Sequence, residues 1–217
     1  MPYTDTKTKP KLIYYYDALC GWCYGFSPVI SGLQEEYKGV LNFKVISGGL
    51  FLGNRAGFVN DVAPHIKSGA YKSVESRTGV KFGEPFLDDV FGKGKMALNS
   101  LPPSIALCIV REKFPDKELE FSEMLLSAVY SDGMNPIIVE EYKKYVAKIG
   151  FDFEDFSRKM KDDKYKEMAE NEFEIFRNNQ FSGMPALVLE KNGQQILLSN
   201  GYLEYNELKI RIDKFLE

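Results

Sequence analysis

The sequence predicts an α/β fold in which a mixed sheet with flanking helices is interrupted by a long, all-helical insertion. Three observations support this fold class. A strand, a helix and a second strand follow one another within residues 11–47. Helical patterns then occupy residues 55–178, and strand patterns return only afterwards. We therefore expect a core made of residues 1–54 and 179–217, with residues 55–178 inserted between its two parts.

The first unit is a strand, a helix and a second strand. Residues 11–16, KLIYYY, are rich in strand formers and predict a buried strand. In residues 27–39, SPVISGLQEEYKG, apolar residues recur at helical spacing, and Gly39 is a natural helix stop. Residues 40–47, VLNFKVIS, alternate as a strand does. Such a unit of about thirty-five residues predicts two parallel strands joined by a crossover helix.

The insertion is predicted to be a bundle of about five helices, because apolar residues recur on one helical face in successive segments. These segments are residues 104–114, 118–130, 139–149, 153–163 and 164–178. Asp152 is the expected N-cap of the fourth helix. Proline- and glycine-containing stretches, LPPS at 101–104 and DGMNP at 132–136, are expected to separate helices.

The second part of the core begins with residues 185–199, PALVLEKNGQQILLS. Two runs of strand formers flank Asn192-Gly193, which is the strongest hairpin signal in the chain. A last helix carries Leu208, Ile212 and Phe215 on one face. The end of the chain is therefore predicted to be a β-hairpin followed by a helix.

Composition narrows the function classes. The chain has 217 residues, 44% of them hydrophobic and 27% charged, which is typical of a globular protein. A net charge of −3 disfavours a nucleic-acid partner. No segment reaches the roughly 18–20 apolar residues that span a bilayer, and the polar start lacks a signal-peptide core. We therefore expect a cytoplasmic protein with neither nucleic acid nor membrane as a partner.

Three cysteines and one histidine are too few for a disulfide framework or for a closed structural zinc site within one chain. Two of the cysteines, Cys20 and Cys23, lie three residues apart in DALCGWCYGF, residues 17–26. This pair stands where the first strand ends and its helix begins. Its context therefore favours redox chemistry, and the alternatives are an incidental pair or half of a metal site shared between two chains.

The position of the pair predicts how each cysteine would act. Unpaired N–H groups and the dipole at a helix N-terminus favour an anion such as a thiolate. Cysteines in such a setting, or in Cys-X-X-Cys motifs, have pKa values lowered from about 8.5 to roughly 3.5–7.5. We expect Cys20 to be an exposed, nucleophilic thiolate. Cys23, in the first helical turn, is placed to attack the mixed disulfide and release the product.

A second piece of the site is predicted in SGMPALVLE, residues 182–190. Pro185 stands directly before the returning strand, either as an ordinary strand-start proline or in a cis turn that faces the cysteines. A cis Met184–Pro185 bond would leave the backbone of Met184 to pair with an extended substrate. It would also hold the substrate sulfur near Cys20.

With these two pieces, the chain resembles the thioredoxin superfamily and, within it, the DsbA-like disulfide oxidoreductases. YYYDALCGWCYGF is most similar to the FrnE-like branch, which is related to 2-hydroxychromene-2-carboxylate isomerases and kappa-class glutathione transferases. The resemblance covers nearly the whole chain and implies a thioredoxin-like core. It implies that Cys20 attacks, that Cys23 resolves and that Pro185 is the cis-proline opposite them. It also implies that Gly21 and Trp22 tune the redox potential.

The predicted function is thiol–disulfide oxidoreductase, of the protein disulfide oxidoreductase or isomerase type, using the CGWC dithiol without a metal or organic cofactor. Expected partners are protein or small-molecule disulfides and thiols, with glutathione as a candidate reducing co-substrate. One rival hypothesis is a glutathione-dependent isomerase or transferase, whose members carry serine where Cys20 stands. Another is a non-enzymatic peptide-binding or chaperone module. The Gly-Trp dipeptide, in place of the Pro-His of the best-known strong oxidant, leaves the direction of electron flow open.

Four other residues stand out by their type or their position. Asp17 either accepts a proton from Cys23 or tunes the pair by its charge, or it is a solvated strand-end residue. Trp22 is expected to be exposed and to offer apolar surface to a substrate. Cys108 is predicted to be buried and inert on an apolar helical face. His65 has no Ser, Asp or second His nearby in the sequence, and we expect it to have no catalytic or metal-binding role.

Overall fold

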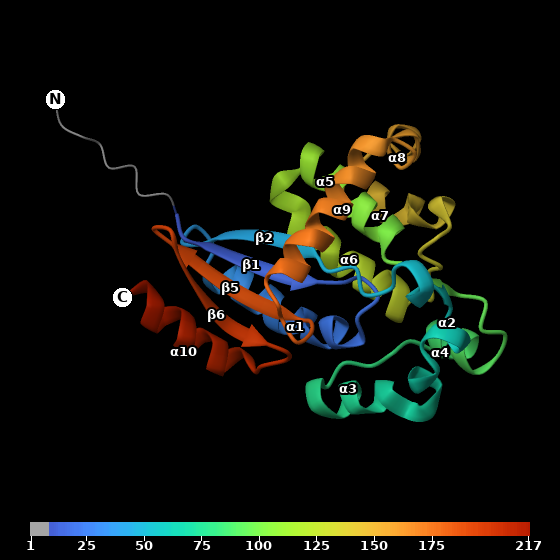
Figure 1. Ribbon diagram of the computed structural model, residues 1–217, viewed down its shortest axis with the longest axis horizontal. Coiled ribbons are helices and arrows are strands. Elements are labelled where there is room, and N and C mark those ends of the chain that lie inside the picture. Colours follow the sequence, from blue (N-terminus) through green and yellow to red (C-terminus); the bar gives the residue numbers. More distant parts are fainter. Residues whose placement is uncertain (1–8) are drawn as a thin grey trace.

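A mixed four-stranded sheet lies at the centre of the computed structural model, which describes residues 9–217 (Figure 1). The strand order is β2-β1-β5-β6. β1 (Lys11–Tyr16) pairs in parallel with β2 (Asn42–Ser47), as the sequence predicts. β5 (Ala186–Lys191) pairs antiparallel with both β1 and β6 (Gln194–Asn200), which makes the sheet mixed.

β1 is buried on both faces because it is a central strand, which explains its unbroken apolar run. Tyr14 and Tyr16 face the main core, which they share with the helix that follows the strand. Tyr15 faces the opposite side, where its ring packs against those of Phe176 and Phe181 at centroid distances of 6.2 and 4.8 Å. The strand thus anchors helices on both faces of the sheet.

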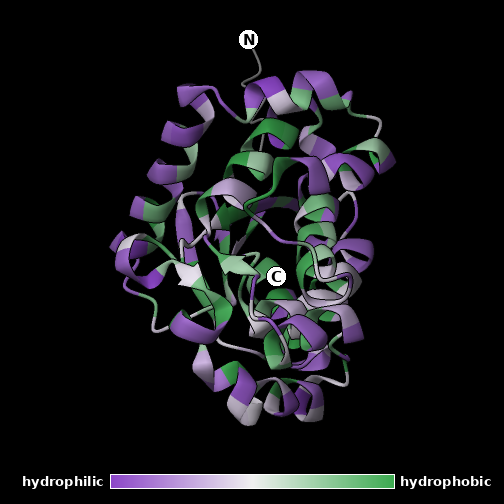
Figure 2. Cartoon of the chain, turned by 90° about the vertical axis from the view of Figure 1, so that its right-hand side faces the viewer, coloured by the Kyte–Doolittle hydropathy of each residue, from purple (hydrophilic) through white to green (hydrophobic). Residues whose placement is uncertain are grey.

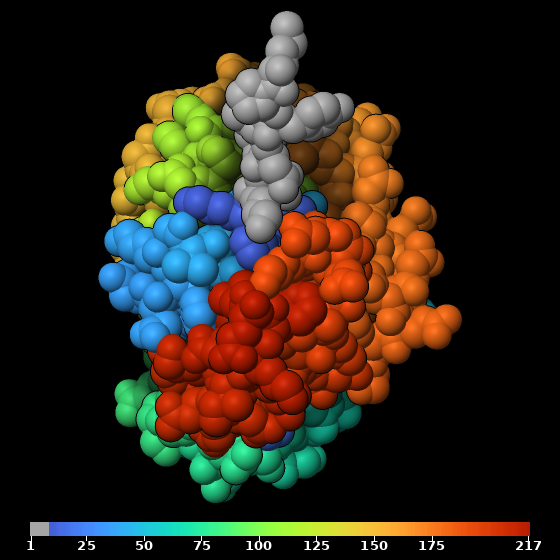
Figure 3. Space-filling model, turned by 90° about the vertical axis from the view of Figure 1, so that its left-hand side faces the viewer, coloured from blue at the N-terminus to red at the C-terminus, as the bar shows by residue number. Residues whose placement is uncertain are grey.

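Two helices distant in sequence lie side by side on one face of the sheet. α1 (Gly21–Glu36) connects β1 to β2, and α10 (Tyr205–Leu216) ends the chain. The Tyr37 hydroxyl donates a 2.6 Å hydrogen bond to Asp213, and Lys209 forms a 2.6 Å ion pair with Glu36. Figure 3 shows α10 in red beside the blue segment that leads from α1 into β2. These contacts hold the C-terminal end of α1 against α10.

The segment between β2 and β5 is helical, as predicted, but it contains more helices than the five expected. It contains eight α-helices: α2 (Val59–Val62), α3 (Tyr71–Thr78), α4 (Glu84–Phe91), α5 (Leu101–Lys113), α6 (Glu118–Tyr130), α7 (Lys143–Lys148), α8 (Phe153–Lys159) and α9 (Asp163–Asn178). Short 3-10 or π turns cover Gly53–Arg55, Ile66–Ala70, Pro115–Lys117 and Val139–Tyr142. The segment also holds a small antiparallel pair, β3 (Gly57–Phe58) with β4 (Ala97–Leu98), which the sequence analysis missed. The division of the chain after residues 54 and 178 stays a prediction.

Local sequence signals explain several boundaries. The Asp152 side chain accepts the N–H of Asp155 at 2.9 Å, which confirms it as the N-cap of α8. The turn between β5 and β6 has φ angles of 53° at Asn192 and 78° at Gly193, as the Asn-Gly signal predicts. The stretch LPPS does not separate helices but opens α5, because prolines are tolerated in a first turn that needs no N–H.

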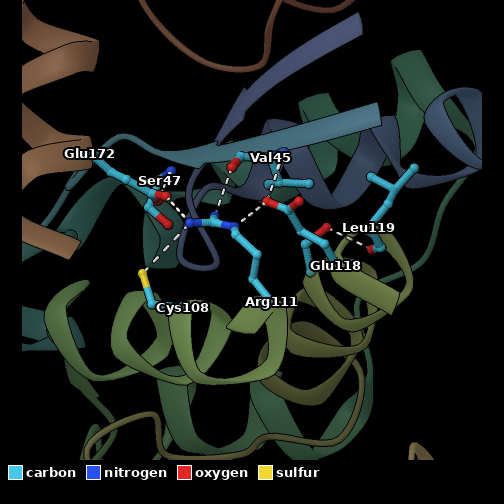
Figure 4. A network of polar contacts seen from close by, with 8 residues as sticks. Val45, Ser47, Cys108, Arg111, Glu118, Leu119 and Glu172 are labelled. Atoms are coloured by element: carbon cyan, nitrogen blue, oxygen red, sulfur yellow. Dashed lines mark hydrogen bonds and ion pairs between the residues drawn. The ribbon is translucent and has the colours of Figure 1, made fainter. Parts of the chain in front are cut away.

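The outer edge of β2 is bonded to charged side chains of the helical segment (Figure 4). The Arg111 guanidinium donates to the Val45 carbonyl at 2.9 Å and lies between the carboxylates of Glu118 and Glu172. Those carboxylates accept the N–H groups of Val45 and Ser47 at 3.0 and 2.8 Å. An edge strand is thereby covered, and α5, α6 and α9 are tied to the sheet.

Hydrophobic residues are concentrated in the interior of the molecule, whereas hydrophilic residues predominate at its periphery (Figure 2). The main buried cluster runs continuously from the sheet into the helical segment. In the part of the chain that the structure describes, no helix combines the length and the apolar character needed to cross a membrane.

Candidate active site

Cys20 is the residue from which α1 starts. Its backbone is extended (φ −95°, ψ 108°), and its sulfur accepts the N–H of Cys23 at 3.4 Å. The turn from β1 is closed by a 3.0 Å hydrogen bond from the Cys20 N–H to the Asp17 carbonyl. The strand-to-helix junction predicted from DALCGWC is therefore confirmed. Cys20 Sγ receives a helix N–H, and Cys23 lies in the first turn.

The segment around Pro185 lies directly opposite this junction. The Met184–Pro185 peptide bond is cis, as the resemblance implied, and β5 begins at the next residue. The Cys20 thiol donates a hydrogen bond to the Met184 carbonyl, with 3.6 Å between sulfur and oxygen. Pro185 is buried, and its carbonyl accepts the N–H of Gly201 at 2.7 Å. Two pieces 164 residues apart thus form one site.

Both sulfurs are nearly enclosed. Cys20 is 6% exposed and Cys23 is fully buried, so the expectation of an exposed Cys20 is wrong. The physical reason is the helical segment, whose Val74 and Phe82 line the same pocket as Cys20. Burial, together with the neighbouring Cys20, raises the pKa of Cys23 well above its usual value. Cys23 is therefore a protonated thiol at neutral pH.

Cys20 and Gly21, the first residue of α1, lie on the wall of a mostly apolar pocket between the sheet and the helical segment. Aromatic and aliphatic side chains make up most of the other walls, among them Leu19, Phe51, Ile66, Tyr71 and Tyr130. His65, which the sequence analysis set aside, is exposed and also lines this pocket. A substrate that reaches the Cys20 sulfur must therefore place its adjoining group against apolar surface.

Trp22 separates this pocket from a second one. Its side chain belongs to both linings and is 38% exposed, which agrees with the expected exposure. The second pocket is lined by Arg77, Met184 and Tyr202, and the Trp22 and Tyr202 rings lie 6.4 Å apart. The tryptophan thus presents apolar surface both to the pocket that Cys20 lines and to the pocket that Met184 lines.

Asp17 is buried, with 1% of its surface exposed, so the solvated strand-end interpretation is wrong. Its carboxylate accepts hydrogen bonds from the N–H groups of Leu19 and Leu50, at 2.9 and 2.7 Å, and from the Ser100 hydroxyl at 3.0 Å. Burial raises the pKa of Asp17, and these hydrogen bonds oppose the rise. Asp17 therefore joins the end of β1 to the loop after β2 and to the residue before α5. Proton transfer between Asp17 and Cys23 stays a prediction.

Comparison with known proteins identifies the family. A model of the DSBA-like thioredoxin domain matches residues 11–209. The chain belongs to this family. Membership supports thiol–disulfide oxidoreductase chemistry in general, and the FrnE-like branch stays a prediction. A search of curated proteins found no significant match for this DSBA-like chain.

Solved structures share the fold over nearly the whole DSBA-like chain. A candidate protein disulfide isomerase from Nitrosomonas europaea is 25% identical with a TM-score of 0.84, covering 96% of this chain and 98% of that chain. The cytosolic disulfide reductase DsbM from Pseudomonas aeruginosa is 22% identical with a TM-score of 0.74, covering 95% and 98%. The thiol-disulfide exchange protein α-DsbA2 from Wolbachia pipientis is 17% identical with a TM-score of 0.59, covering 98% and 84%.

Two buried tyrosines also lie near the pair, and the sequence analysis did not identify either as a site residue. Tyr14 of β1 is fully buried, and the neighbouring Cys23 and Cys20 add to the effect of burial in raising its pKa. The pKa of Tyr130, on α6, is raised in the same way, and Tyr130 lines the pocket that contains Cys20. Strand alternation predicts that Tyr14 faces α1. No local signal brings α6 to the same place.

Cys108 takes no part in this site. It is fully buried on α5, and burial raises its pKa to about 12, which agrees with the predicted inert packing role. Its sulfur lies 3.9 Å from an Arg111 nitrogen, in the network at the edge of β2 (Figure 4). Within residues 9–217, no group of three or more His, Cys, Asp and Glu side chains is arranged to hold a metal ion.

Proposed function

We propose that this DSBA-like protein is a thiol–disulfide oxidoreductase of the protein disulfide oxidoreductase or isomerase type, in which Cys20 attacks and Cys23 resolves. One observation carries the proposal. The Cys20 sulfur stands at the start of α1, receives the Cys23 N–H and faces both the Met184 carbonyl and the apolar pocket. It is the sulfur of the pair that a substrate can reach.

The first step is attack by the Cys20 thiolate on one sulfur of a substrate disulfide. The positive end of α1 and the Cys23 N–H favour the anionic sulfur. A bond forms between Cys20 and the attacked sulfur, and the substrate S–S bond breaks. The second substrate sulfur leaves as a thiolate and takes up a proton.

The second step uses the thiol of Cys23. It loses its proton, attacks the Cys20 sulfur of the mixed disulfide and expels the remaining substrate thiolate, which takes up the proton. Two electrons have then passed to the substrate, and Cys20 and Cys23 are joined. The raised pKa of Cys23 keeps it protonated between the steps. The reverse sequence oxidises a substrate dithiol, and neither direction needs a metal or an organic cofactor.

Met184 and Pro185 position the substrate in this proposal. The backbone of Met184 faces Cys20 and is placed to pair with an extended substrate, which would bring the substrate sulfur into line with the attacking one. Trp22 and the apolar pocket contact the neighbouring substrate groups, and the Gly21-Trp22 dipeptide tunes the potential of the pair. Protein disulfides and small-molecule disulfides are both candidate substrates.

Glutathione is the proposed reducing partner. The neighbour DsbM is described as a cytosolic disulfide reductase and was also crystallised with glutathione. Those descriptions support a cytoplasmic location and a glutathione-dependent cycle for this chain. Equilibration of the Cys20–Cys23 couple in glutathione buffers gives its potential. A pair that fails to exchange with glutathione would remove this partner from the proposal.

The test of the function is turnover of a small disulfide, with dithiothreitol recycling the protein. Wild-type protein should accelerate the reduction, and Cys20→Ser should abolish the acceleration. Cys108→Ser serves as the matched control and should behave as wild type, because Cys108 is buried away from the pocket. Full activity in Cys20→Ser would overturn the mechanism.

A further inference from the structure

The hydroxyl of Tyr14 is an unexplained polar group in the core. Tyr14 is fully buried, and its hydroxyl has no hydrogen-bond partner among the residues that the structure describes. A buried hydroxyl without a partner is unfavourable, and phenylalanine would fill the same space without that cost. The tyrosine therefore calls for an explanation other than packing.

Tyr14 packs against aromatic rings in the main core, and the two cysteines of the site act electrostatically on its hydroxyl. Its ring lies 5.8 Å from that of Phe26 and 5.6 Å from that of Tyr16. Burial, followed by Cys23 and Cys20, raises the pKa of Tyr14 well above its usual value. The phenol is therefore a neutral donor across the physiological pH range, beside a Cys23 sulfur that is itself fully buried.

The second step of the exchange creates a need for such a donor. A thiol sulfur is a weak acceptor, whereas a thiolate is an anion and accepts strongly. The charges of Cys20 and of the Asp17 carboxyl both raise the pKa of Cys23, and a hydrogen bond from the Asp17 backbone opposes that rise. Tyr16 and Tyr130 are also buried and neutral, and burial is the largest cause that raises the pKa of each. These groups provide no positive charge to offset the Cys23 thiolate.

We propose that the Tyr14 hydroxyl donates a hydrogen bond to the Cys23 sulfur as it becomes a thiolate in the resolving step. This inference rests on the proposed function for the step that it serves. Tyr14 keeps its own proton. The proton released by Cys23 goes to the departing substrate thiolate, and the Cys20–Cys23 bond forms as the bond from Cys20 to the substrate breaks. The unpaired hydroxyl of the resting protein is thus held ready for a charge that exists only during turnover.

The kinetic test separates the two steps by acid quench and mass spectrometry. Reduced protein is mixed with oxidised glutathione, and the mixed disulfide at Cys20 is followed in time. Tyr14→Phe should leave the rate of its formation unchanged and slow its resolution by about tenfold, the loss expected for one charge-assisted hydrogen bond. Tyr16→Phe, a buried tyrosine on the same face of β1, is the matched control and should resolve at the wild-type rate. Equal resolution rates in Tyr14→Phe and wild type would overturn the proposal.

A second measurement does not depend on the proposed function. In Cys20→Ser, the 13Cβ chemical shift of Cys23 reports its titration, and adding Tyr14→Phe should move that titration to higher pH. An unchanged titration would overturn the role of Tyr14 even if disulfide exchange is never observed. Conversely, wild-type protein that forms no mixed disulfide with oxidised glutathione would remove glutathione as the proposed partner, and it would leave the titration test of Tyr14 unaffected. Tyr14→Phe should unfold at no lower denaturant concentration than wild type, because it removes an unpaired hydroxyl; a clear loss of stability would show a structural role instead.

Discussion

The thiol of Cys20 donates a hydrogen bond to the backbone carbonyl of Met184, with 3.6 Å between sulfur and oxygen. The contact joins the two parts of the chain that build the sheet, at the atom proposed to react. It also means that the Met184 backbone and the sulfur proposed to attack already lie within hydrogen-bonding distance of each other before a substrate arrives. The position of Met184 should therefore affect the rate of exchange more than it affects stability.

Gly48 offers a way to move Met184. A Cβ at Gly48 would overlap the Met184 sulfur and lie 2.8 Å from its methyl carbon. We predict that Gly48→Ala slows disulfide exchange by about threefold or more, because it displaces the Met184 side chain that lines a pocket together with Trp22. It should lower stability by less than about 1.5 kcal/mol, because the displaced atoms end a flexible side chain. Gly32→Ala, on α1 against Tyr205, is a control that should leave exchange unchanged. Equal exchange rates in the two variants would contradict the positioning role of Met184.

Asp17 should matter for stability, because its carboxylate bonds three separate segments. Asparagine would turn an NH₂ donor toward backbone N–H groups that now donate to Asp17. We predict that Asp17→Asn lowers the free energy of unfolding by about 2–3 kcal/mol, measured by urea denaturation. Ser100→Ala, which removes the bonds to Asp17 and to the Phe51 N–H, should cost about 1–2 kcal/mol. An Asp17→Asn protein as stable as wild type would show that these bonds contribute little.

Glu123 should make stability depend on pH. Burial raises its pKa from 4.5 to about 7, although the Ser31 hydroxyl donates to it. Between these two values the native state keeps a proton that the unfolded state has released, so stability falls as pH rises through this window. Relative to Glu123→Gln, wild-type protein should lose about 1–3 kcal/mol between pH 4.5 and 7, allowing for the side chain's partial exposure. Parallel pH profiles for the two proteins would contradict the raised pKa.

The ion-pair network around Arg111 predicts that removing its positive charge strongly lowers the free energy of unfolding. Glu118 and Glu172 keep only 8% and 7% of their side chains exposed, so removal of Arg111 would leave two buried carboxylates without a counter-charge. We predict that Arg111→Met costs about 3–5 kcal/mol in urea denaturation. Adding Glu118→Gln and Glu172→Gln should recover part of that loss. A cost below about 1 kcal/mol would show that the network is solvated.

The parts of the fold predicted from sequence are those fixed by neighbouring residues. A run of strand formers followed directly by a helical pattern predicted the junction at Cys20. Asn192-Gly193 predicted the hairpin, because both residues adopt positive φ. Short helices were harder to recognise. α2 has four residues, and the turn before α3 contains Gly69 with a φ of 100°, so no continuous helical period exists there.

The environment of the site depends on distant contacts, and the sequence could not show it. The partners of Asp17 include Leu50 and Ser100, which are 33 and 83 residues away, so its burial has no local signature. Cys20 was expected to be exposed because the motif alone does not reveal that Phe82 shares its pocket. Residue types at the junction thus predicted where Cys20 lies relative to β1 and α1, whereas the packing of the helical segment determines how far Cys20 is exposed.

The central claim is that Cys20 attacks and Cys23 resolves, and trapping tests it most directly. Reduced Cys23→Ser protein, mixed with oxidised glutathione, should accumulate one glutathione on Cys20, identified by mass spectrometry of the peptide that contains it. Cys20→Ser should accumulate none, because Cys23 is fully buried and its pKa is raised. Glutathione found on Cys23 in Cys20→Ser, with none on Cys20 in Cys23→Ser, would contradict the assignment.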